Sequence, residues 1–416
     1  MEFKKYKLNE IAQFSQGKQV DVKEQYEKKE NGMKRFVRIV DYTNVNEPIR
    51  YVKDYGERYY ASEKELVMIR YGSQTAGMVA MGKNGIIANN MFKINLDNSV
   101  VLNKYMYYYL SQKEIFNFLK NSQSSSTMPA ISFSMLNNFE VSIPSIIIQR
   151  KVINVLEKID DKIEVNNQIN DNLLEQAKLI YKEWFINFNY LKNGIKNKNE
   201  LENTTYGLLP KGWTFKTISE MNLDISDGNY SNKYPTKKEF QNQGIPFIRG
   251  TDFNGLSISR KNLMYISPEK HEILKKGHLK KDDILITTRG EIGRIAFVSD
   301  FFIDSNINAQ LIRINGGTKY PMSFLGMSLL SDYAQKDIQS LVTGTALQQL
   351  PVGKFNQIKL IIPDDDSIIK EFDNIVGTIL KKIQANEDQN EILEQLRDTL
   401  LPKLMNGEID LDKIEI

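Results

Sequence analysis

The sequence predicts an α+β protein in which two β-rich globular domains of mixed structure are each followed by a long helix. Two observations support this fold class. The chain repeats one plan twice, and in each copy the spacing of apolar residues changes from strand-like alternation to steps of three and four after a proline. We expect the two helices to pair as an antiparallel coiled coil, which gives the protein an internal pseudo-twofold repeat.

The repeat consists of four sequence matches that occur in the same order in both halves of the chain. The first is FVRIVD at 36–41 against FIRGTD at 247–252, an apolar pair followed by arginine and then aspartate. The others are an apolar strand that ends in arginine and precedes a glycine, at 66–80 against 284–296; VSIP at 141–144 against LIIP at 360–363; and LEQ at 174–176 against 393–395. Four ordered matches indicate a duplication.

The segments after the two prolines show the alternating steps of four and three residues that keep one seam facing a partner helix. The predicted seam of the first helix is Val152, Leu156, Ile159, Ile163, Asn166, Asn170, Leu173, Ala177, Ile180 and Trp184. That of the second is Phe372, Val376, Ile379, Ile383, Asn386, Asn390, Leu393, Arg397, Leu400 and Leu404. Because Arg397 fits an apolar seam poorly, we expect neighbouring Leu396 to make that contact.

Asparagine occupies the same two seam positions in both helices, Asn166 and Asn170 in the first and Asn386 and Asn390 in the second. A buried asparagine costs stability and specifies register, because only a polar group across the seam satisfies it. In an antiparallel pair the asparagines would face each other. The alternative is that each helix packs only on its own globular domain.

These patterns divide the chain into five segments. The globular domains are 1–144 and 209–363, and the helices occupy 145–190 and 364–416, the latter with a C-terminal tail. Residues 191–208 are polar and rich in lysine and asparagine, as expected of an exposed connection.

Composition excludes several chemistries. The chain has no cysteine, which removes thiol chemistry and cysteine-ligated metals and fits a reducing compartment. His271 and His278 are its only histidines, too few for an evident metal centre or catalytic triad, so we expect no metal site. There is no uncharged apolar run of ~18 residues, and we expect a soluble cytoplasmic protein without membrane contact. With a net charge of +3, any nucleic-acid surface must be local.

The order of parts and three local runs resemble the specificity subunit of type I restriction-modification systems. The runs are LPKGW at 209–213, the strand-proline-helix junction that ends in Gln149-Arg150, and LLPKLMNGEIDL at 400–411. The resemblance spans essentially the whole chain and is strongest in the helices and at their ends.

The resemblance implies that 1–144 and 209–363 are target recognition domains, each reading one half of a split target in double-stranded DNA. The helices would set the gap between the halves and dock two methyltransferase subunits, which would bind S-adenosylmethionine and methylate adenine N6. A restriction subunit, where present, would add ATP- and Mg²⁺-dependent cleavage. The chain itself would bind no cofactor and would not be an enzyme on its own.

The residues agree with a non-catalytic role. The sequence has no Asn-Pro-Pro-aromatic base-flipping motif, no glycine-rich cofactor loop after an opening strand and no Walker lysine. PDDD at 363–366 is similar to a nuclease carboxylate cluster, but it stands at a helix start, where aspartate caps free N–H groups.

Base reading uses arginine, asparagine and glutamine in the major groove, and phosphates are bound by cations, hydroxyls and backbone N–H groups. The candidates in the first domain are Arg38, Arg70, Tyr71, Ser73, Gln74, Asn89, Asn90, Ser126 and Thr127. Those in the second are Arg249, Thr288, Arg289, Glu291, Arg294, Asn306, Asn308, Gln310, Gly344 and Thr345. For any one of them, a surface loop or an internal hydrogen bond is an equally good interpretation.

A second class of function stays open on the residues alone, a protein-interaction scaffold whose charged loops bind no nucleic acid. An adaptor for DNA predicts sequence-dependent binding that weakens with salt, because phosphate contacts release counterions. A scaffold predicts no base preference.

Overall fold

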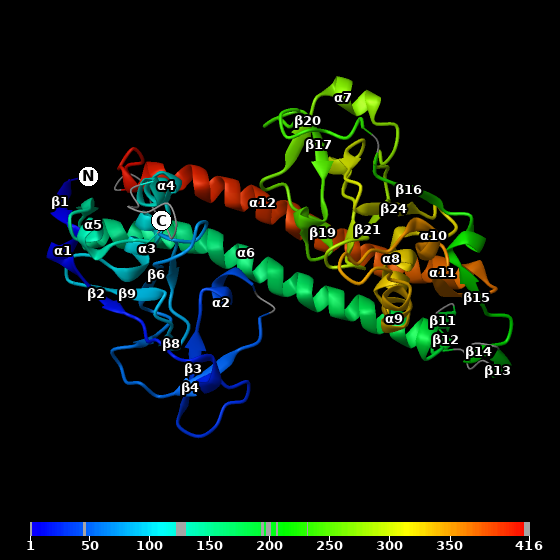
Figure 1. The fold of residues 1–416 in the computed structure, drawn as a ribbon, viewed down its shortest axis with the longest axis horizontal. Coiled ribbons are helices and arrows are strands. Elements are labelled where there is room, and N and C mark those ends of the chain that lie inside the picture. The colour runs from blue at the N-terminus through cyan, green and yellow to red at the C-terminus, as the bar shows by residue number, and fades with distance from the viewer. Residues whose placement is uncertain are drawn as a thin grey trace. The chain divides into compact units, whose positions relative to one another are not determined.

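The computed structural model describes residues 2–44, 47–121, 130–192, 195–196, 201–204, 207–230 and 232–411. Its contacts form two compact units, Met1–Lys162 with Ile392–Ile416, and Ile163–Glu391. Figure 1 shows the two long helices, α6 (Ile146–Tyr181) and α12 (Thr378–Met405), each of which contributes residues to both units. The units therefore contain the globular segments together with parts of both helices.

The first unit contains two four-stranded sheets and a separate strand pair. One sheet is antiparallel, in the order β2 (Ala12–Gln16), β9 (Met91–Leu96), β6 (Leu66–Ile69), β7 (Val79–Met81). The other has the order β4 (Arg50–Lys53), β3 (Met33–Val37), β8 (Gly85–Ile87), β5 (Tyr60–Ala61), with β3 and β8 parallel. The pair is β1 (Phe3–Lys7) with β10 (Glu140–Pro144). All four residues of β6 are buried, as expected of a strand covered on both faces.

Short helices cover these sheets and connect them to the long ones. They are α1 (Leu8–Ile11), α2 (Val40–Thr43), α3 (Asn103–Ser111), α4 (Lys113–Asn121) and α5 (Phe133–Asn137). Tyr105 of α3 lies in one core cluster with Val152 of α6 and Leu404 of α12. The hydroxyl of Tyr108 donates to Asp160 of α6 at 2.7 Å. The long helices are thus part of the first unit's core.

The second unit repeats this plan with one strand fewer in its second sheet. Its antiparallel sheet has the order β16 (Asp224–Asp227), β24 (Leu311–Asn315), β21 (Ile284–Thr287), β22 (Ile295–Phe297). Its second sheet is β20 (Met264–Ile266), β17 (Ile245–Ile248), β23 (Asn306–Ile307), with β17 and β23 parallel, and β15 (Thr214–Thr217) pairs with β25 (Lys359–Ile362). Leu66 faces Ile94 in the first unit as Ile284 faces Ile314 in the second. The predicted duplication is confirmed.

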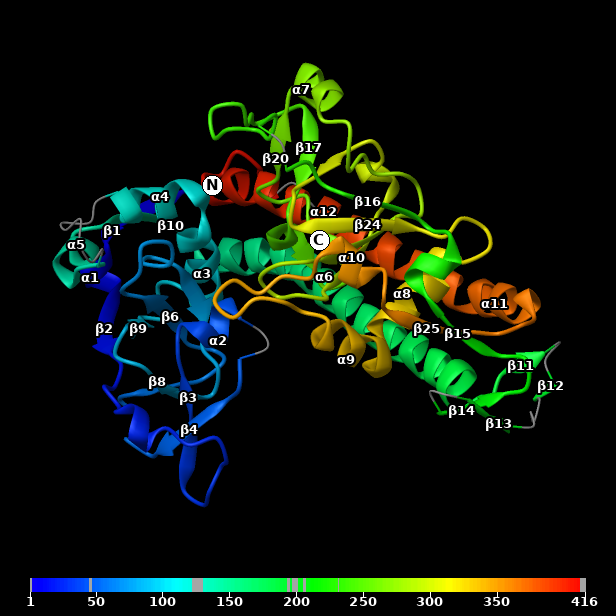
Figure 2. The same cartoon turned by 45° about the vertical axis from the view of Figure 1, so that its right-hand side comes forward.

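The helices of the second unit are α7 (Pro268–Ile273), α8 (Met322–Leu330), α9 (Asp332–Ser340), α10 (Val352–Phe355) and α11 (Asp366–Phe372). A hairpin of β18 (Phe253–Asn254) and β19 (Ser257–Ile258) is added between β17 and β20. In both views α9 lies beside the C-terminal part of α6, where Tyr181 and Tyr333 line one pocket (Figure 2). The polar connection predicted at 191–208 contains two short antiparallel pairs, β11 (Leu191–Lys192) with β12 (Ile195–Lys196) and β13 (Leu201–Thr204) with β14 (Gly207–Pro210).

The sequence runs at the domain and helix ends are structural. Gly212 adopts a positive φ of 85° in the turn that closes from Trp213 N–H to the Pro210 carbonyl. Trp213 then packs on Phe185, with ring centroids 5.8 Å apart, in the core of the second unit. In the 400–411 run, Leu411 joins the core of the first unit.

The helix that follows β25 begins as predicted. Asp365 is its N-cap, and its carboxylate accepts the Ser367 N–H at 2.8 Å, which accounts for the PDDD run without a nuclease role. From there α11 continues through a π-helical turn, Asp373–Gly377, into α12. All predicted seam positions of both helices are buried or half-buried. No helix in the described part of the chain is long and apolar enough to cross a membrane.

The helices pair antiparallel through the asparagines, as the sequence predicts. In the second unit, Asn166 Nδ2 donates to Asn390 Oδ1 at 2.8 Å, and Asn386 Nδ2 donates to Asn170 Oδ1 at 2.7 Å. Asn390 in turn donates to Asn167 at 2.9 Å. In the repeat, Asn166 corresponds to Asn386 and Asn170 corresponds to Asn390. The Asn166–Asn390 pair therefore corresponds to the Asn386–Asn170 pair, and the contact is isologous.

The expectation that Leu396 replaces Arg397 at the seam is wrong. Leu396 is 45% exposed, whereas Arg397 is half-buried in the first unit and its Nη1 lies 2.9 Å from Asp160 Oδ1 of α6. The arginine is accommodated because an opposite charge stands across the seam, and Tyr108 donates to the same carboxylate.

Asn390→Ala should destabilise the chain by about 1–2 kcal/mol, because it removes one of the two acceptors of the fully buried Asn166 amide, Gln389 being the other, and also the bond to Asn167. Thermal or urea unfolding measures this loss. Gln168→Ala, on the exposed side of α6, is the matched control and should have little effect. Equal stability of Asn390→Ala and the control would show that the seam amides do not contribute.

Glu387 predicts a pH-dependent stability. Burial against the β19 segment raises its pKa to about 7; the nearby negative charges of Asp388 and Glu391 add to this, and a hydrogen bond with Ser257 opposes it. Its ordinary pKa is 4.5, so between pH 4.5 and about 7 the unfolded chain loses this proton first and stability falls as pH rises. Above pH 7 the loss is complete.

Glu387→Gln should therefore raise stability at pH 8 by about 2 kcal/mol and leave it unchanged at pH 4. Melting temperatures of wild type and variant across this range test the prediction. The control is Glu175→Gln at an exposed position of α6. A Glu387→Gln gain that is the same at both pH values would refute the assignment.

Candidate nucleic-acid interface

The arginine–aspartate pairs of the repeated motif hold turns. Asp41 and Asp252 are 6% and 5% exposed. Each accepts the backbone N–H and the Nε–H of the arginine three residues earlier, at 2.8 and 3.1 Å from Arg38 and at 2.7 and 3.1 Å from Arg249. Arg38 also pairs with Glu47 at 3.1 Å. Both arginines were candidates for DNA contact, and we assign them to the fold because buried carboxylates occupy their guanidinium groups.

The structure corrects the alignment of the two strands that end in arginine. The N–H of Arg70 donates to the carbonyl of Asn90, and in the second unit the N–H of Thr288 donates to the carbonyl of Gln310, both at 2.8 Å. Arg70 therefore corresponds to Thr288, and Arg289 lies one residue further along. Arg70 and Arg289 therefore occupy positions that differ by one residue in the two corresponding loops.

A polar network surrounds Arg70 in the first unit. Its Nη1 donates to Gln16 Oε1 at 2.6 Å, and its guanidinium lies 5.1 Å from the ring centre of Tyr71. The Gln16 amide donates to the carbonyl of Asn89, and the Asn89 side chain donates to Gln19. Guanidinium and amide groups at a surface are the types that read base edges in the major groove.

A surface pocket lies beside this network. Arg38, Asn89 and Asn90 all line it. Asn90 is half-buried, and its Oδ1 has no hydrogen-bond partner among the described residues. An unsatisfied acceptor beside a pocket is available to a ligand or to water.

The β6–β7 loop carries the exposed candidates of the first unit. Ser73 and Gln74 face solvent, and Lys120 of α4 donates to Gln74 at 3.3 Å. Ser126 and Thr127 lie outside the described residues.

In the second unit the exposed candidates gather at the end of β21. We define the hairpin surface as Tyr230, Arg289, Gln310, Gly344, Thr345 and Leu347, all of them exposed. Arg289 connects them, because its Nη2 donates to Gln349 at 3.0 Å and its guanidinium lies 6.0 Å from the ring centre of Tyr230. Thr343 and Gln349 exchange two backbone hydrogen bonds at 2.9 Å, so the residues between them form a projecting tip. Leu347 at this tip is 88% exposed.

Three predicted DNA contacts are buried instead. Asn306 is fully buried and its Oδ1 lies 2.6 Å from His271 Nδ1. Thr288 donates its hydroxyl to the Gln310 carbonyl at 2.9 Å, and Asn308 accepts the Gln310 N–H at 3.0 Å. The prediction is wrong for these residues because their polar atoms support the loop from below and do not reach its surface.

Glu291 and Arg294 pair with each other at 3.2 Å beside the hairpin surface. Arg294 also donates to the Phe253 carbonyl at 3.0 Å, which leaves Glu291, 80% exposed in its side chain, as the more accessible of the two.

Residues 270–281 of the second domain are rich in lysine, and most of these lysines are neutralised by ion pairs. The ion pairs are Lys270 with Glu239 at 2.8 Å, Lys275 with Glu272 at 3.8 Å, Lys276 with Asp227 at 3.1 Å and Lys280 with Asp224 at 2.8 Å. The hydrogen bond from Lys270, together with weaker ones from Thr236, lowers the pKa of Glu239 to about 2. This face is a mixed, solvated surface and does not form a basic patch.

Sequence reasoning missed Gln16, Gln19 and Tyr230. A fifth repeat match, SQG at 15–17 against SDG at 226–228, would have indicated the place. Both glycines are required by packing, since a Cβ at Gly17 or Gly228 would lie 2.1 or 2.3 Å from a backbone carbonyl oxygen of the strand segment opposite. The residues beside these glycines are therefore held close to the next loop.

Arg249→Ala should destabilise the second unit by about 3 kcal/mol, because it leaves the buried Asp252 carboxylate without its cation. Arg289→Ala is the matched control, an exposed arginine whose loss should leave the melting temperature unchanged. Differential scanning calorimetry compares the two. Equal stability of both variants would contradict the structural assignment of Arg249.

Comparisons with known proteins agree with this duplicated architecture. A family model described as the type I restriction modification DNA specificity domain matches residues 1–175 and 210–398. The MjaIX type I restriction enzyme specificity subunit of Methanocaldococcus jannaschii is 28% identical over 340 residues, 81% of this chain and 76% of the relative. The HindI specificity subunit of Haemophilus influenzae is 24% identical over 383 residues, 78% of this chain and 82% of the relative.

A solved structure has the same fold. The crystal structure of the type I restriction-modification system S subunit from M. genitalium superposes with a TM-score of 0.55 at 16% identity, covering 97% of this chain and 96% of that one. The family model matches twice, and its two matches fall on the two copies of the repeat that the strand order independently defines. This chain therefore belongs to the type I restriction-modification DNA specificity family.

Proposed function

We propose that this chain is the DNA-reading, non-catalytic specificity subunit of a type I restriction-modification complex. Each globular domain reads one half of a bipartite target in double-stranded DNA, and the paired helices set the gap and dock methyltransferase subunits. The observation that carries the proposal is the double match of a DNA specificity family to a duplicated fold. The same match disfavours a scaffold without DNA specificity.

The divergence of the loops supports recognition of two different half-sites. The strands of the two units correspond in order and register, whereas the side chains at their loop ends differ. Arg70 of the first unit corresponds to Thr288, and Gln16 corresponds to Asp227. Because base reading depends on the donors and acceptors presented, different loops on the same frame favour an asymmetric target.

The partners supply the chemistry in this proposal. Methyltransferase subunits, two for one chain, bind S-adenosylmethionine and methylate adenine N6, and a restriction subunit, where present, uses ATP and Mg²⁺. The chain holds them on DNA and acts in the cytoplasm, together with the DNA it marks.

The function is tested by expressing the chain with its methyltransferase subunit in an unmethylated host and mapping N6-methyladenine across the genome. The expected result is a split motif with two fixed halves that disappears when this chain is omitted. A folded, purified complex that leaves every adenine unmethylated would contradict the proposal.

Arg289→Ala should relax or abolish recognition of one half-site and leave the other unchanged, because Arg289 is the exposed cation at the centre of the hairpin surface. Loss of a bidentate contact with a base is worth about 1–3 kcal/mol, or roughly 10- to 100-fold in methylation efficiency. The same methylome measurement reads both halves.

Lys336→Ala, at an exposed position of α9 in the same unit, is the control and should leave the motif intact. Wild-type methylation at both halves by the Arg289→Ala complex would remove Arg289 from the recognition surface.

A further inference from the structure

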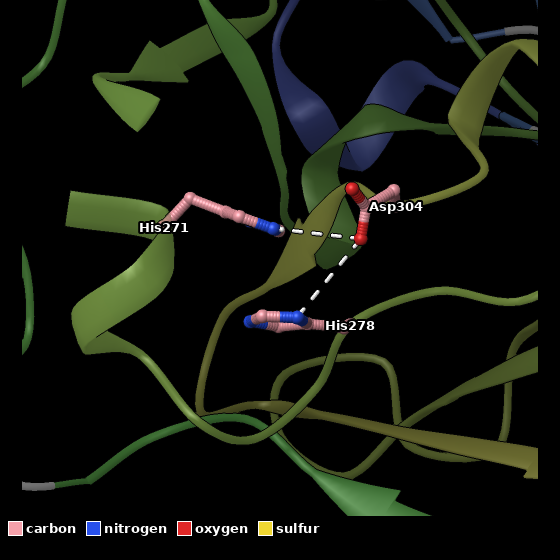
Figure 3. A group of neighbouring side chains, drawn as sticks. All are labelled: His271, His278 and Asp304. Carbon is pink, nitrogen blue, oxygen red and sulfur yellow. Dashed lines mark ion pairs between the residues drawn. The ribbon is translucent and has the colours of Figure 1, made fainter. Parts of the chain in front are cut away.

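Two histidines and an aspartate meet at one edge of the second unit, although the sequence indicated no metal site. His271 lies in the last turn of α7, His278 lies before β21 and Asp304 lies before β23 (Figure 3). One potential ligand atom from each lies within 4.8 Å of the other two. The backbone bridge between His278 and Asn306 brings these segments together. Sequence spacing did not reveal the cluster because its members come from three separate segments.

Hydrogen bonds hold both imidazoles in the form that binds metals. His278 Nε2 faces the carbonyl of Leu274, which can only accept, so the proton sits on Nε2 and the lone pair on Nδ1. His271 Nδ1 lies 2.6 Å from the amide oxygen of the buried Asn306, so its lone pair sits on Nε2. A carbonyl or amide oxygen behind each ring is the support that metal-ligating histidines use.

The nitrogen of each ring that has no hydrogen-bond partner among the described residues lies near the same carboxylate. His271 Nε2 lies 3.4 Å and His278 Nδ1 lies 4.0 Å from Asp304 Oδ1 (Figure 3). Two imidazole nitrogens and a carboxylate gathered this closely favour a positive charge among them, which either a proton or a metal ion supplies. We propose that His271, His278 and Asp304 bind one divalent transition-metal ion of the Zn²⁺ class.

The distances suit a small ion after a modest movement. Ligand atoms on a tetrahedral ion with bonds of ~2.0–2.1 Å are roughly 3.3 Å apart, close to the separation of His271 and Asp304. The two rings stack with centroids 4.0 Å apart, so the His278 ring must tilt out of the stack to direct its lone pair at the ion. Two imidazole nitrogens and one carboxylate favour Zn²⁺, Co²⁺ or Ni²⁺ over Mg²⁺, which prefers oxygen ligands.

A bound ion would brace a segment that adjoins the hairpin surface. The chain between His271 and His278 contains Lys276, whose carbonyl accepts the Asn229 side chain at 2.8 Å, next to Tyr230. With three protein ligands the site keeps an open position for water, since the Asp304 side chain is 71% exposed. The role is structural, and the proposal does not depend on the DNA-reading function.

The test uses the full chain, stripped with a chelator and then titrated with Zn²⁺ in a calorimeter. We expect one ion per chain, a rise in melting temperature and no competition from Mg²⁺. Co²⁺ in place of Zn²⁺ should give the visible absorption of a tetrahedral nitrogen and oxygen site. Because the chain has only two histidines, nuclear magnetic resonance can follow both imidazoles, and Zn²⁺ should shift both.

Asp304→Asn and His278→Gln should each weaken Zn²⁺ binding at least 10-fold. Both side chains are at least partly exposed, and asparagine tolerates the positive φ of 64° at position 304, so the variants should fold. Glu272→Gln, an exposed carboxylate of α7 outside the cluster, is the matched control and should bind as wild type does. No saturable binding by the wild-type chain, or equal binding by wild type and both variants, would overturn the proposal.

Discussion

The pairing of α6 with the α11–α12 helix through buried asparagines is the constraint on which the rest of the architecture depends. An amide in a largely dry seam needs a partner, and one register places Asn166 against Asn390 and Asn170 against Asn386. A shift of one residue along the seam would break these bonds at a cost of about 1–3 kcal/mol for each unsatisfied group. Because the two helices are copies of one sequence, one register brings the asparagines of both helices into hydrogen-bonded pairs.

Different contacts surround the two ends of the seam. In the second unit Ala177 and Leu380 belong to an aromatic-rich core with Trp184 and Phe372. In the first unit Asp160 and Arg397 form an ion pair with the Tyr108 hydroxyl beside it. The helices are therefore part of both hydrophobic cores.

The two globular domains share one framework of strands and differ in their loops. Corresponding strands keep the same order and register, and the Arg-x-x-Asp turns and the paired glycines at 17 and 228 are used in both copies. What differs lies at the loop ends, with half-buried Gln16, Arg70 and Asn89 in one unit and exposed Tyr230, Arg289 and Leu347 in the other. A frame that tolerates loop changes allows the two halves of a DNA target to vary independently.

The sequence by itself indicated the duplication and the long helices, and it predicted that the helices pair antiparallel with their asparagines facing one another. These are periodic or repeated features, and a repeat or a hydrophobic period is visible without knowledge of distant contacts. It also supplied the candidate loops, but it could not tell Arg289, which reaches solvent, from Arg249, which holds a buried aspartate. Only the tertiary structure decided that Asn306 lies buried behind His271, that Asp160 accommodates Arg397 and that His271, His278 and Asp304 meet. The reason is that burial and partnership depend on segments far apart in the chain, which local patterns do not record.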